Sequence, residues 1–230
     1  MSMKPGTDVS VIIVAGGSGT RMGSDIPKQF LLLGGRPVLM HTIERFAFVL
    51  READIIVVLP EKEIACWRSL CEEYCFQVSC RIVAGGSTRF ESVKKGLEIV
   101  EPGCKWIAVH DGVRPLVSEN LILRCIKEVT EYGAVIPVVE VTDSLREIDG
   151  ESSRIVPRER YRQVQTPQIF DAEILKKAYG CPYKESFTDD ASVVESIGVP
   201  IHLTLGERLN IKITTPEDLK LVKLPGFSLF

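Results

Sequence analysis

The sequence lacks both a membrane-spanning segment and a surplus of positive charge. No apolar run approaches the ~20 residues that a helix needs to cross a bilayer. The 230 residues carry a net charge of −3, which argues against broad, sequence-independent binding to nucleic acid. The N-terminal stretch MSMKPGTDVS has one lysine and no apolar segment, so we expect no secretion signal. We therefore expect a cytoplasmic protein that has neither a membrane nor a nucleic acid as its partner.

The seven cysteines include no Cys-x-x-Cys pair, the spacing on which many zinc sites depend. Their odd number, in a compartment that we expect to be reducing, also disfavours a framework of disulfides. We therefore predict free thiols rather than disulfides or a zinc site.

The composition is that of an ordinary globular protein, with 45% hydrophobic and 26% charged residues. Short β-branched runs alternate with segments of helical period, and a chain of this length suits one α/β domain covering residues 1–230. This alternation predicts a doubly wound, mostly parallel sheet. The expected strands lie at 11–14, 54–59, 81–84, 106–109, 134–141 and 200–205, and the expected helices at 37–49, 61–74, 88–100 and 118–133 and from about 171, 188 and 215.

The pattern changes between residues 142 and 165, where the sequence is polar and charged. Asp149 and Gly150 can form a hairpin turn between two short alternating segments, which predicts a projecting β-arm. Such an arm is only marginally stable alone, so we expect it to pack on a symmetric partner subunit. A surface loop without regular structure is the alternative.

The segment VIIVAGGSGTRMGSDIPKQF joins an apolar strand to a glycine loop that carries two cations. Gly16, Gly17 and Gly19 allow a tight turn whose N–H groups can face anionic oxygens. Arg21 and Lys28 add fixed positive charge, which suits a triphosphate with about four negative charges. We therefore predict a phosphate cradle, with a plain turn bearing two solvated cations as the alternative.

Two better-known glycine motifs fit this loop poorly. A P-loop requires Gly-Lys-Ser/Thr, whereas Lys28 follows Pro27 and precedes Gln29. A dinucleotide fingerprint would place Met22 where a third glycine allows close helix packing, and Arg21 inside the pyrophosphate turn. The P-loop is excluded, and dinucleotide binding stays a disfavoured alternative.

Further polar residues follow other expected strands, where ligands bind in open α/β sheets. Arg89 follows the strand at 81–84, and the sequence HDGVR follows the strand at 106–109. Asp111 has three possible roles: ligand of a metal, acceptor for a substrate hydroxyl, or cap of a turn. His110 fits the end of a strand better than a catalytic role, because no nucleophile motif accompanies it. Lys212 alternates with apolar residues at an expected strand end and is either solvated or a ligand.

Seven motifs occur here in the order found in one enzyme family: VAGGSGTRMG, PKQF, GGSTRFESV, HDGVRP, QTPQIF, TDDAS and NIKITTPEDL. From residue 11 to about residue 221 the chain resembles the 2-C-methyl-D-erythritol 4-phosphate cytidylyltransferases of the non-mevalonate isoprenoid pathway. The resemblance implies a nucleotide-diphospho-sugar transferase fold and a homodimer joined through the β-arm. It also implies cytidylyl transfer from CTP to the polyol phosphate, release of pyrophosphate, and a divalent metal such as Mg²⁺, with Asp111 as a candidate ligand.

The resemblance assigns roles to individual residues. It implies that the triphosphate is held by Gly16, Gly17, Arg21 and Lys28. The nucleoside contacts would be Val14, Ala15, Gly85, Gly86, Ser92 and Gly112. The polyol phosphate would face Asp111, Arg114, Thr166 and Lys212, and from the neighbouring subunit Ser144 and Arg158. The cations expected to act in catalysis are Arg21, Lys28 and Lys212. Ser144 stands where the family commonly has Thr, and Gly112 where many relatives have Ala.

Three other functions compete with this interpretation. A ribitol 5-phosphate cytidylyltransferase would share the glycine loop and the PKQF and QTPQ segments. A non-catalytic nucleotide-binding protein could keep the same fold. A dinucleotide-dependent oxidoreductase would bind a nicotinamide cofactor. Assays with CTP and each acceptor separate the first two from the proposed activity, and a cofactor titration separates the third.

Overall fold

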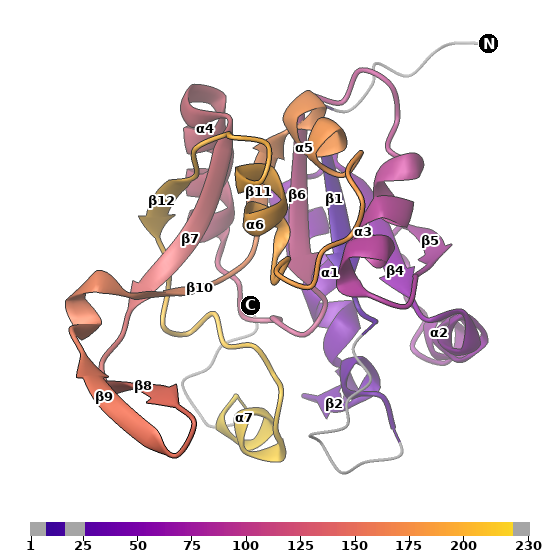
Figure 1. Ribbon diagram of the computed structural model, residues 1–230. Helices are drawn as coiled ribbons and strands as arrows, with labels where there is room; N and C mark the ends of the chain where they lie inside the picture. The colour runs from indigo at the N-terminus through magenta and orange to yellow at the C-terminus, as the bar shows by residue number, and fades with distance from the viewer. Residues whose placement is uncertain (1–7, 17–25, 223–230) are drawn as a thin grey trace.

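A mixed β-sheet forms the centre of the molecule in the computed structural model, which describes residues 8–16 and 26–222 (Figure 1). The strand order is β10-β7-β11-β6-β1-β4-β5, and β12 pairs with β7. The strands are β1 (Val9–Val14), β2 (Leu32–Leu33), β3 (Arg36–Pro37), β4 (Asp54–Leu59), β5 (Arg81–Ala84), β6 (Trp106–Asp111), β7 (Ala134–Glu140), β8 (Leu145–Asp149), β9 (Ser152–Val156), β10 (Arg162–Val164), β11 (Gln168–Asp171) and β12 (His202–Leu205). The helices are α1 (Val38–Val49), α2 (Glu61–Glu73), α3 (Arg89–Glu98), α4 (Glu119–Tyr132), α5 (Ala172–Ala178), α6 (Asp190–Glu195) and α7 (Pro216–Leu221), with 3₁₀ turns η2 (Lys28–Phe30) and η3 (Arg158–Arg160).

The middle of the sheet is parallel because crossover helices connect its strands. β1 pairs in parallel with both β4 and β6, and β4 pairs in parallel with β5. β11 is inserted antiparallel between β6 and β7. The predicted doubly wound, mostly parallel sheet is confirmed, with antiparallel pairing confined to β10 and β11.

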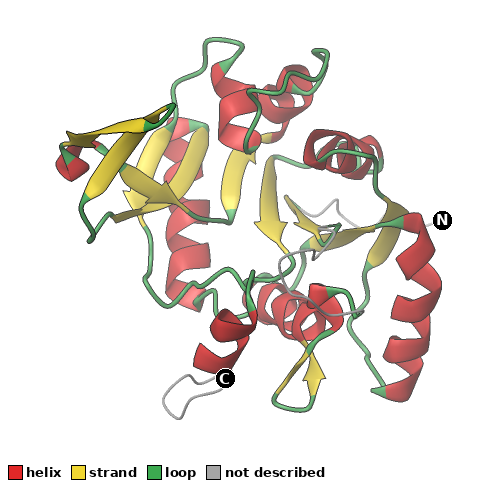
Figure 2. Ribbon diagram, turned by 60° about the horizontal axis from the view of Figure 1, so that its bottom comes forward, coloured by secondary structure: helices red, strands yellow, loops and turns green. Residues whose placement is uncertain are grey.

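Apolar side chains cover both faces of the sheet, which accounts for the continuous apolar runs in its strands. Val11 and Ile13 of β1 belong to a buried cluster with residues of α1, α2 and α4. Ile12 points to the opposite face and belongs to a cluster with residues of α3, α5 and α6. Figure 2 shows helices on both sides of the sheet. The two cores hold the sheet rigid and fix the positions at which its strands end.

The helix boundaries follow local signals in the sequence. Thr88 caps α3, accepting at Oγ1 from the N–H of Glu91 at 3.1 Å, and the Glu91 carboxylate accepts in return from the N–H of Thr88. Ser118 caps α4 by accepting at Oγ from the N–H of Leu121 at 3.0 Å, and Gly133 ends that helix with a φ of +74°. A glycine is needed at that position because other residues rarely adopt a positive φ. The predicted start and end of this helix are thereby confirmed.

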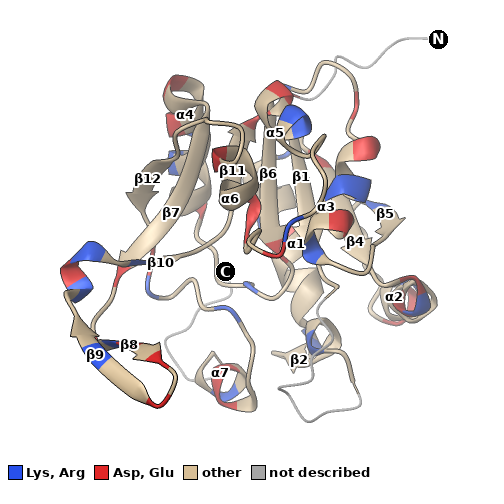
Figure 3. Ribbon diagram, viewed as in Figure 1, with Lys and Arg blue, Asp and Glu red and all other residues tan. Residues whose placement is uncertain are grey.

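The predicted hairpin at residues 142–165 is present and projects away from the sheet (Figure 1). Leu145 pairs with Val156 at its base, and Asp149 pairs with Ser152 at its tip. Both signs of charge lie along the hairpin and η3 (Figure 3). Ile148 and Ile155 are 70% and 72% exposed, so this arm has an apolar surface that its own chain leaves uncovered.

Two local predictions were wrong. Residues 210–214 were expected to end a strand around Lys212, but they form no strand in the structure. Two hydrogen bonds hold the segment in place instead. The side-chain amide of Asn210 donates to the carbonyl of Thr166 at 2.8 Å, and the backbone N–H of Ile213 donates to the carbonyl of Val113 at 2.9 Å. β6 also continues beyond residue 109 to Asp111.

Across residues 8–16 and 26–222, none of the helices has the length and apolar character that crossing a bilayer requires.

Candidate functional site

A cleft opens at the carboxyl ends of β1 and β6, where they meet the start of α3. Lys28 and Lys212, which are far apart in sequence, both line this cleft. The other lining residues are Val14, Ala15, Gly16, Gln29, Gly86, Ser87, Thr88, Arg89, Ser92, Asp111 and Val113. The cleft therefore brings together the glycine loop, the start of α3 and the end of β6, as expected for a ligand site in an open α/β sheet.

Asp111 is a buried carboxylate held between two cations. Its Oδ2 lies 3.0 Å from Arg114 Nε and 3.1 Å from Lys212 Nζ. Burial alone would raise the pKa of Asp111, but the positive charges of Lys212, Arg114 and Arg89 outweigh burial and hold that pKa well below its usual value. Asp111 is therefore ionised at neutral pH, and it fixes the position of the Lys212 ammonium group at the cleft.

These contacts leave little capacity for a resident metal ion. Asp111 is the only carboxylate among the described residues that line the cleft, and its Oδ2 already faces two cations. Within the described ranges, no three His, Cys, Asp or Glu side chains are grouped as metal ligands. The described residues do not fit a resident metal site, and no step of the proposed mechanism depends on one. The expected role of Asp111 as a metal ligand stays a prediction, which its ion pairs disfavour.

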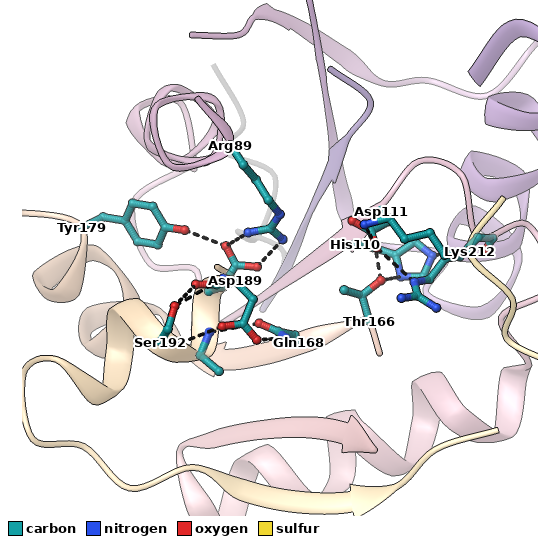
Figure 4. A network of polar contacts seen from close by, with 12 residues as sticks. Arg89, His110, Asp111, Thr166, Gln168, Tyr179, Asp189, Ser192 and Lys212 are labelled. Carbon is teal, nitrogen blue, oxygen red and sulfur yellow. Dashed lines mark hydrogen bonds and ion pairs between the residues drawn. The ribbon is translucent and has the colours of Figure 1, made fainter. Parts of the chain in front are cut away.

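A hydrogen-bonded network connects the end of β6 to the segment that leads into β11 (Figure 4). His110 Nδ1 lies 3.0 Å from Thr166 Oγ1, and that oxygen accepts from the N–H of Asp111 at 3.1 Å. Arg114 Nη1 donates to the carbonyl of Asn210 at 2.8 Å. Burial lowers the pKa of His110 to about 3, so its ring is neutral at physiological pH. The network holds Asp111, Arg114 and Thr166 in one rigid group.

A second network, centred on the fully buried Asp190, lies on the other side of the cleft (Figure 4). Arg89 donates from Nη1 and Nη2 to the two oxygens of Asp190, at 2.8 and 2.6 Å. Tyr179 donates its hydroxyl to Asp190 Oδ1 at 2.6 Å. Burial would lower the pKa of Arg89, but the charge of Asp190 outweighs it and raises that pKa above its ordinary value. This forked pairing fixes the guanidinium at the wall of the cleft.

The structure places most of the nucleoside and triphosphate candidates at this cleft. Val14, Ala15, Gly16, Gly86 and Ser92 line it together with Lys28. Gly17, Gly19 and Arg21 lie outside the described residues. These residue roles stay predictions.

Gly85 and Gly112 do not line the described cleft, but both stand where a side chain has no room. A Cβ on Gly85 would lie 2.8 Å from Ser92 Oγ, and a Cβ on Gly112 would lie 2.9 Å from the Cβ of Ala15. Gly112 therefore faces the core beneath the loop, which supports a packing role for this position.

The two arm candidates lie away from this chain's own cleft. Ser144 and Arg158 are exposed and do not line it, and Arg158 donates to the carbonyl of Thr142 within the arm. Their expected role in the cleft of a neighbouring subunit stays a prediction.

Sequence reasoning missed the partner of Arg89. Asp190 lies in the TDDAS motif, which carries the family resemblance but gives this residue no role, and Tyr179 lies outside the motifs. Arg89 and Asp190 are separated by 101 residues, so no local spacing relates them. The available signal was the presence of two consecutive acids, Asp189 and Asp190, at the start of a short helix.

Comparisons with known proteins show the family of the chain. The family model of 2-C-methyl-D-erythritol 4-phosphate cytidylyltransferase matches residues 9–224. The chain belongs to this family. The cytidylyltransferase of Bacteroides thetaiotaomicron is 54% identical over 213 residues, covering 92% of this chain and 96% of the relative. That of Porphyromonas gingivalis (strain ATCC 33277) is 53% identical over 215 residues, covering 93% and 95%.

Solved structures of the cytidylyltransferase family share the fold. The crystal structure of 4-diphosphocytidyl-2C-methyl-D-erythritol synthase from Anaerococcus prevotii has a TM-score of 0.78 at 32% identity, covering 94% of this chain and 96% of that one. The enzyme from Thermus thermophilus has a TM-score of 0.73 at 34% identity, covering 94% and 97%. The predicted nucleotidyltransferase fold is confirmed.

Proposed function

We propose that this chain transfers the cytidylyl group of CTP to 2-C-methyl-D-erythritol 4-phosphate, forming 4-diphosphocytidyl-2-C-methylerythritol and releasing pyrophosphate. The observation that carries the proposal is the convergence of Lys28, Lys212 and the glycines of two loops on one cleft. Membership of the cytidylyltransferase family supplies the identity of the two substrates.

The nucleotide would lie across the cleft from β1 to the start of α3. The backbone at Gly16 and the ammonium group of Lys28 would hold the triphosphate, joined by Gly17 and Arg21 outside the described residues. Gly86 and Ser92 would contact the nucleoside. Ser92 is already positioned for this, because its Oγ accepts from the N–H of Gly86 at 3.1 Å and donates to the carbonyl of Thr88 at 2.9 Å.

The reaction is an in-line displacement at the α-phosphorus of CTP. An oxygen of the acceptor phosphate forms a bond to this phosphorus, and the bond from the phosphorus to the oxygen bridging to the β-phosphate breaks. The electron pair of that bond leaves with pyrophosphate. Because the acceptor is already an anion, no side chain has to form a covalent intermediate, and the main obstacle is repulsion between two anions. Positioning and neutralisation of charge therefore carry the catalysis.

The acceptor would bind on the side of Lys212. Asp111 uses Oδ2 for both of its ion pairs, so its Oδ1 can accept from a hydroxyl of the polyol. Lys212 donates one of its three protons to Asp111, which leaves two for phosphate oxygens. Arg114 and Thr166 complete this side through the network around His110.

Magnesium would enter as part of the nucleotide substrate. Mg²⁺ is commonly held by substrate phosphates and water together with one or two carboxylates, rather than by an all-protein cage. This agrees with a cleft whose described residues do not make a metal site of their own. In the bound complex the ion would supply additional neutralisation of the triphosphate charge.

The β-arm would join two copies of the chain, and residues 1–230 would form one domain that includes it. The exposed Ile148 and Ile155 support this assembly, because a second copy can cover them. Ser144 and Arg158 would then reach the acceptor phosphate bound to the neighbouring subunit. The eight-stranded sheet takes strands from β1 to β12, that is, from both ends of the described chain, which supports the single domain.

The test is release of pyrophosphate from CTP with each of two acceptors. The protein should release pyrophosphate with 2-C-methyl-D-erythritol 4-phosphate at least tenfold faster than with ribitol 5-phosphate. Faster turnover of ribitol 5-phosphate would reassign the acceptor. Binding of CTP without pyrophosphate release from either acceptor would indicate a non-catalytic nucleotide-binding protein.

A further inference from the structure

His110 lies beside the proposed acceptor site, yet the proposed mechanism gives it no role. The side chain is fully buried, and its ring packs edge-on against Phe46 of α1 with the centroids 4.7 Å apart. Its two nitrogens contact different segments of the chain. Nδ1 lies 3.0 Å from Thr166 Oγ1, and Nε2 lies 3.3 Å from the carbonyl oxygen of Arg114.

The surrounding groups allow only one arrangement of protons. The carbonyl oxygen of Arg114 can only accept, so the nitrogen that faces it, Nε2, must carry the proton. A neutral imidazole then has an unprotonated Nδ1. Thr166 Oγ1 accepts from the N–H of Asp111 at 3.1 Å, so the hydroxyl is free to donate its own proton to Nδ1. This tautomer satisfies the ring, the carbonyl of Arg114, the hydroxyl of Thr166 and the N–H of Asp111. The other neutral tautomer leaves the carbonyl of Arg114 facing a nitrogen that has no proton to donate.

We propose that His110 is a positioning residue for the acceptor half of the site. Its ring, protonated on Nε2, ties the turn after β6 to the segment that leads into β11 (Figure 4). Asp111 is the last residue of β6, Arg114 lies in the turn that follows it, and Thr166 lies in the segment that leads into β11. These are the residues assigned to the polyol phosphate. The inference therefore rests on the proposed function. None of the hydrogen bonds described for the ring reaches Gly86 or Ser92, so its loss should affect the acceptor and spare the nucleotide.

The proton assignment can be measured in the unmodified protein. Nitrogen-15 chemical shifts of the histidine rings at pH 7 distinguish the two neutral tautomers. We expect a neutral His110 ring with its proton on Nε2. A proton on Nδ1 would leave Nε2 facing a carbonyl with nothing to donate, and it would overturn the proposal.

Three substitutions separate the two hydrogen bonds from the packing of the ring. His110→Asn places an oxygen near Nδ1 and can accept from Thr166. His110→Gln places an amide N–H near Nε2 and can donate to the carbonyl of Arg114. His110→Phe keeps the contact with Phe46 but makes neither bond. We expect His110→Phe to lower kcat/KM for the polyol phosphate about 10- to 100-fold, with the KM for CTP changed less than twofold. The Asn and Gln variants should each recover part of this loss.

His41 supplies a matched control. It is also a buried histidine, 4% exposed, whose Nε2 lies 2.7 Å from a backbone carbonyl, that of Leu33, but it does not line the cleft. His41→Phe should lower the unfolding midpoint without changing either KM. An unchanged kcat/KM for the acceptor in His110→Phe, or an equal rise of both KM values, would overturn the proposal. If His110→Phe does not fold, the Asn and Gln variants give the same comparison. Absence of turnover in the wild type would refute the proposed function instead, and the nitrogen shifts would still decide the imidazole assignment.

Discussion

Asp190→Asn is a substitution for which the structure predicts a large loss of stability. It keeps the shape of the side chain and removes the negative charge that pairs with Arg89. Asp190 is fully buried and accepts hydrogen bonds from Arg89 and Tyr179. An asparagine retains one oxygen acceptor but removes the carboxylate charge that both guanidinium nitrogens contact.

The magnitude follows from the burial of the two partners. Removing one member of a buried ion pair costs about 3–5 kcal/mol, because the other charge stays behind uncompensated. The Asp190 side chain is 0% exposed, whereas that of Arg89 is 29% exposed and is partly screened by water. We therefore expect the lower end, about 3 kcal/mol. At a urea m-value of about 3 kcal/mol per molar, the unfolding midpoint would fall by about 1 M.

Urea unfolding followed by circular dichroism measures this shift. Tyr179→Phe is the matched comparison, because it removes one hydrogen bond to Asp190 and keeps the charge pair, for a loss of about 1.5 kcal/mol. Since Arg89 lines the cleft, calorimetry should also show weaker CTP binding in Asp190→Asn. A midpoint shift below about 0.3 M, or one no larger than that of Tyr179→Phe, would refute the reasoning.

The remaining predictions concern the cleft, its pH dependence and the arm. A Cβ on Gly86 would overlap the Cβ of Glu91, so Gly86→Ala should weaken CTP binding and lower the unfolding free energy by about 1–3 kcal/mol. An unchanged CTP dissociation constant together with an unchanged unfolding free energy would contradict this prediction. The pKa of His110 is about 3 in the folded protein against about 6.5 unfolded, so the unfolded state binds more protons between these values and stability should rise with pH from 5 to 6.5. In His110→Gln, the unfolding free energy measured by urea titration should change less with pH over this range. An unchanged dependence on pH would contradict the assignment of the effect to His110. The charged groups that face the ring are Asp111, Arg114 and Lys212. If the arm completes a neighbouring site, mixing Arg158→Ala with Lys28→Ala subunits should restore up to about a quarter of wild-type turnover, because random pairing leaves one intact site in half of the dimers; no recovery would count against the dimer.

Local patterns predicted much of the fold because buried strands and capped helices leave clear signals. The run DIIVVL predicted β4 with its observed bounds, and Ser118 and Gly133 marked the ends of α4. β11 was not predicted, because it has only four residues and begins with a polar residue, Gln168, which breaks the apolar pattern although its side chain is 1% exposed. Gln168 can be buried in the sheet because its side-chain amide donates to the carboxylate of Asp189 and accepts from the N–H of Ala191. Only the folded chain brings these groups close to Gln168.

The candidate site was predictable where its residues follow one another in the chain. The turn from Gly86 to Ser92 and the end of β6 could both be recognised locally. The pairing of Asp111 with Lys212 could not be recognised from local sequence, because 101 positions separate the two residues and the segment around Lys212 forms no strand. Contacts of this kind depend on how the sheet orders its strands, and local periodicity does not encode that order.

Cations gathered at the rim of the sheet are the groups that we expect to stabilise the transition state for joining two phosphorylated substrates. The most direct test compares kcat with the CTP dissociation constant in Lys28→Ala and Lys212→Ala. Loss of one preorganised donor should lower kcat by about 10²- to 10³-fold, while the dissociation constant changes by less than about tenfold. Near wild-type turnover in both variants, or a loss confined to CTP binding, would contradict this central claim.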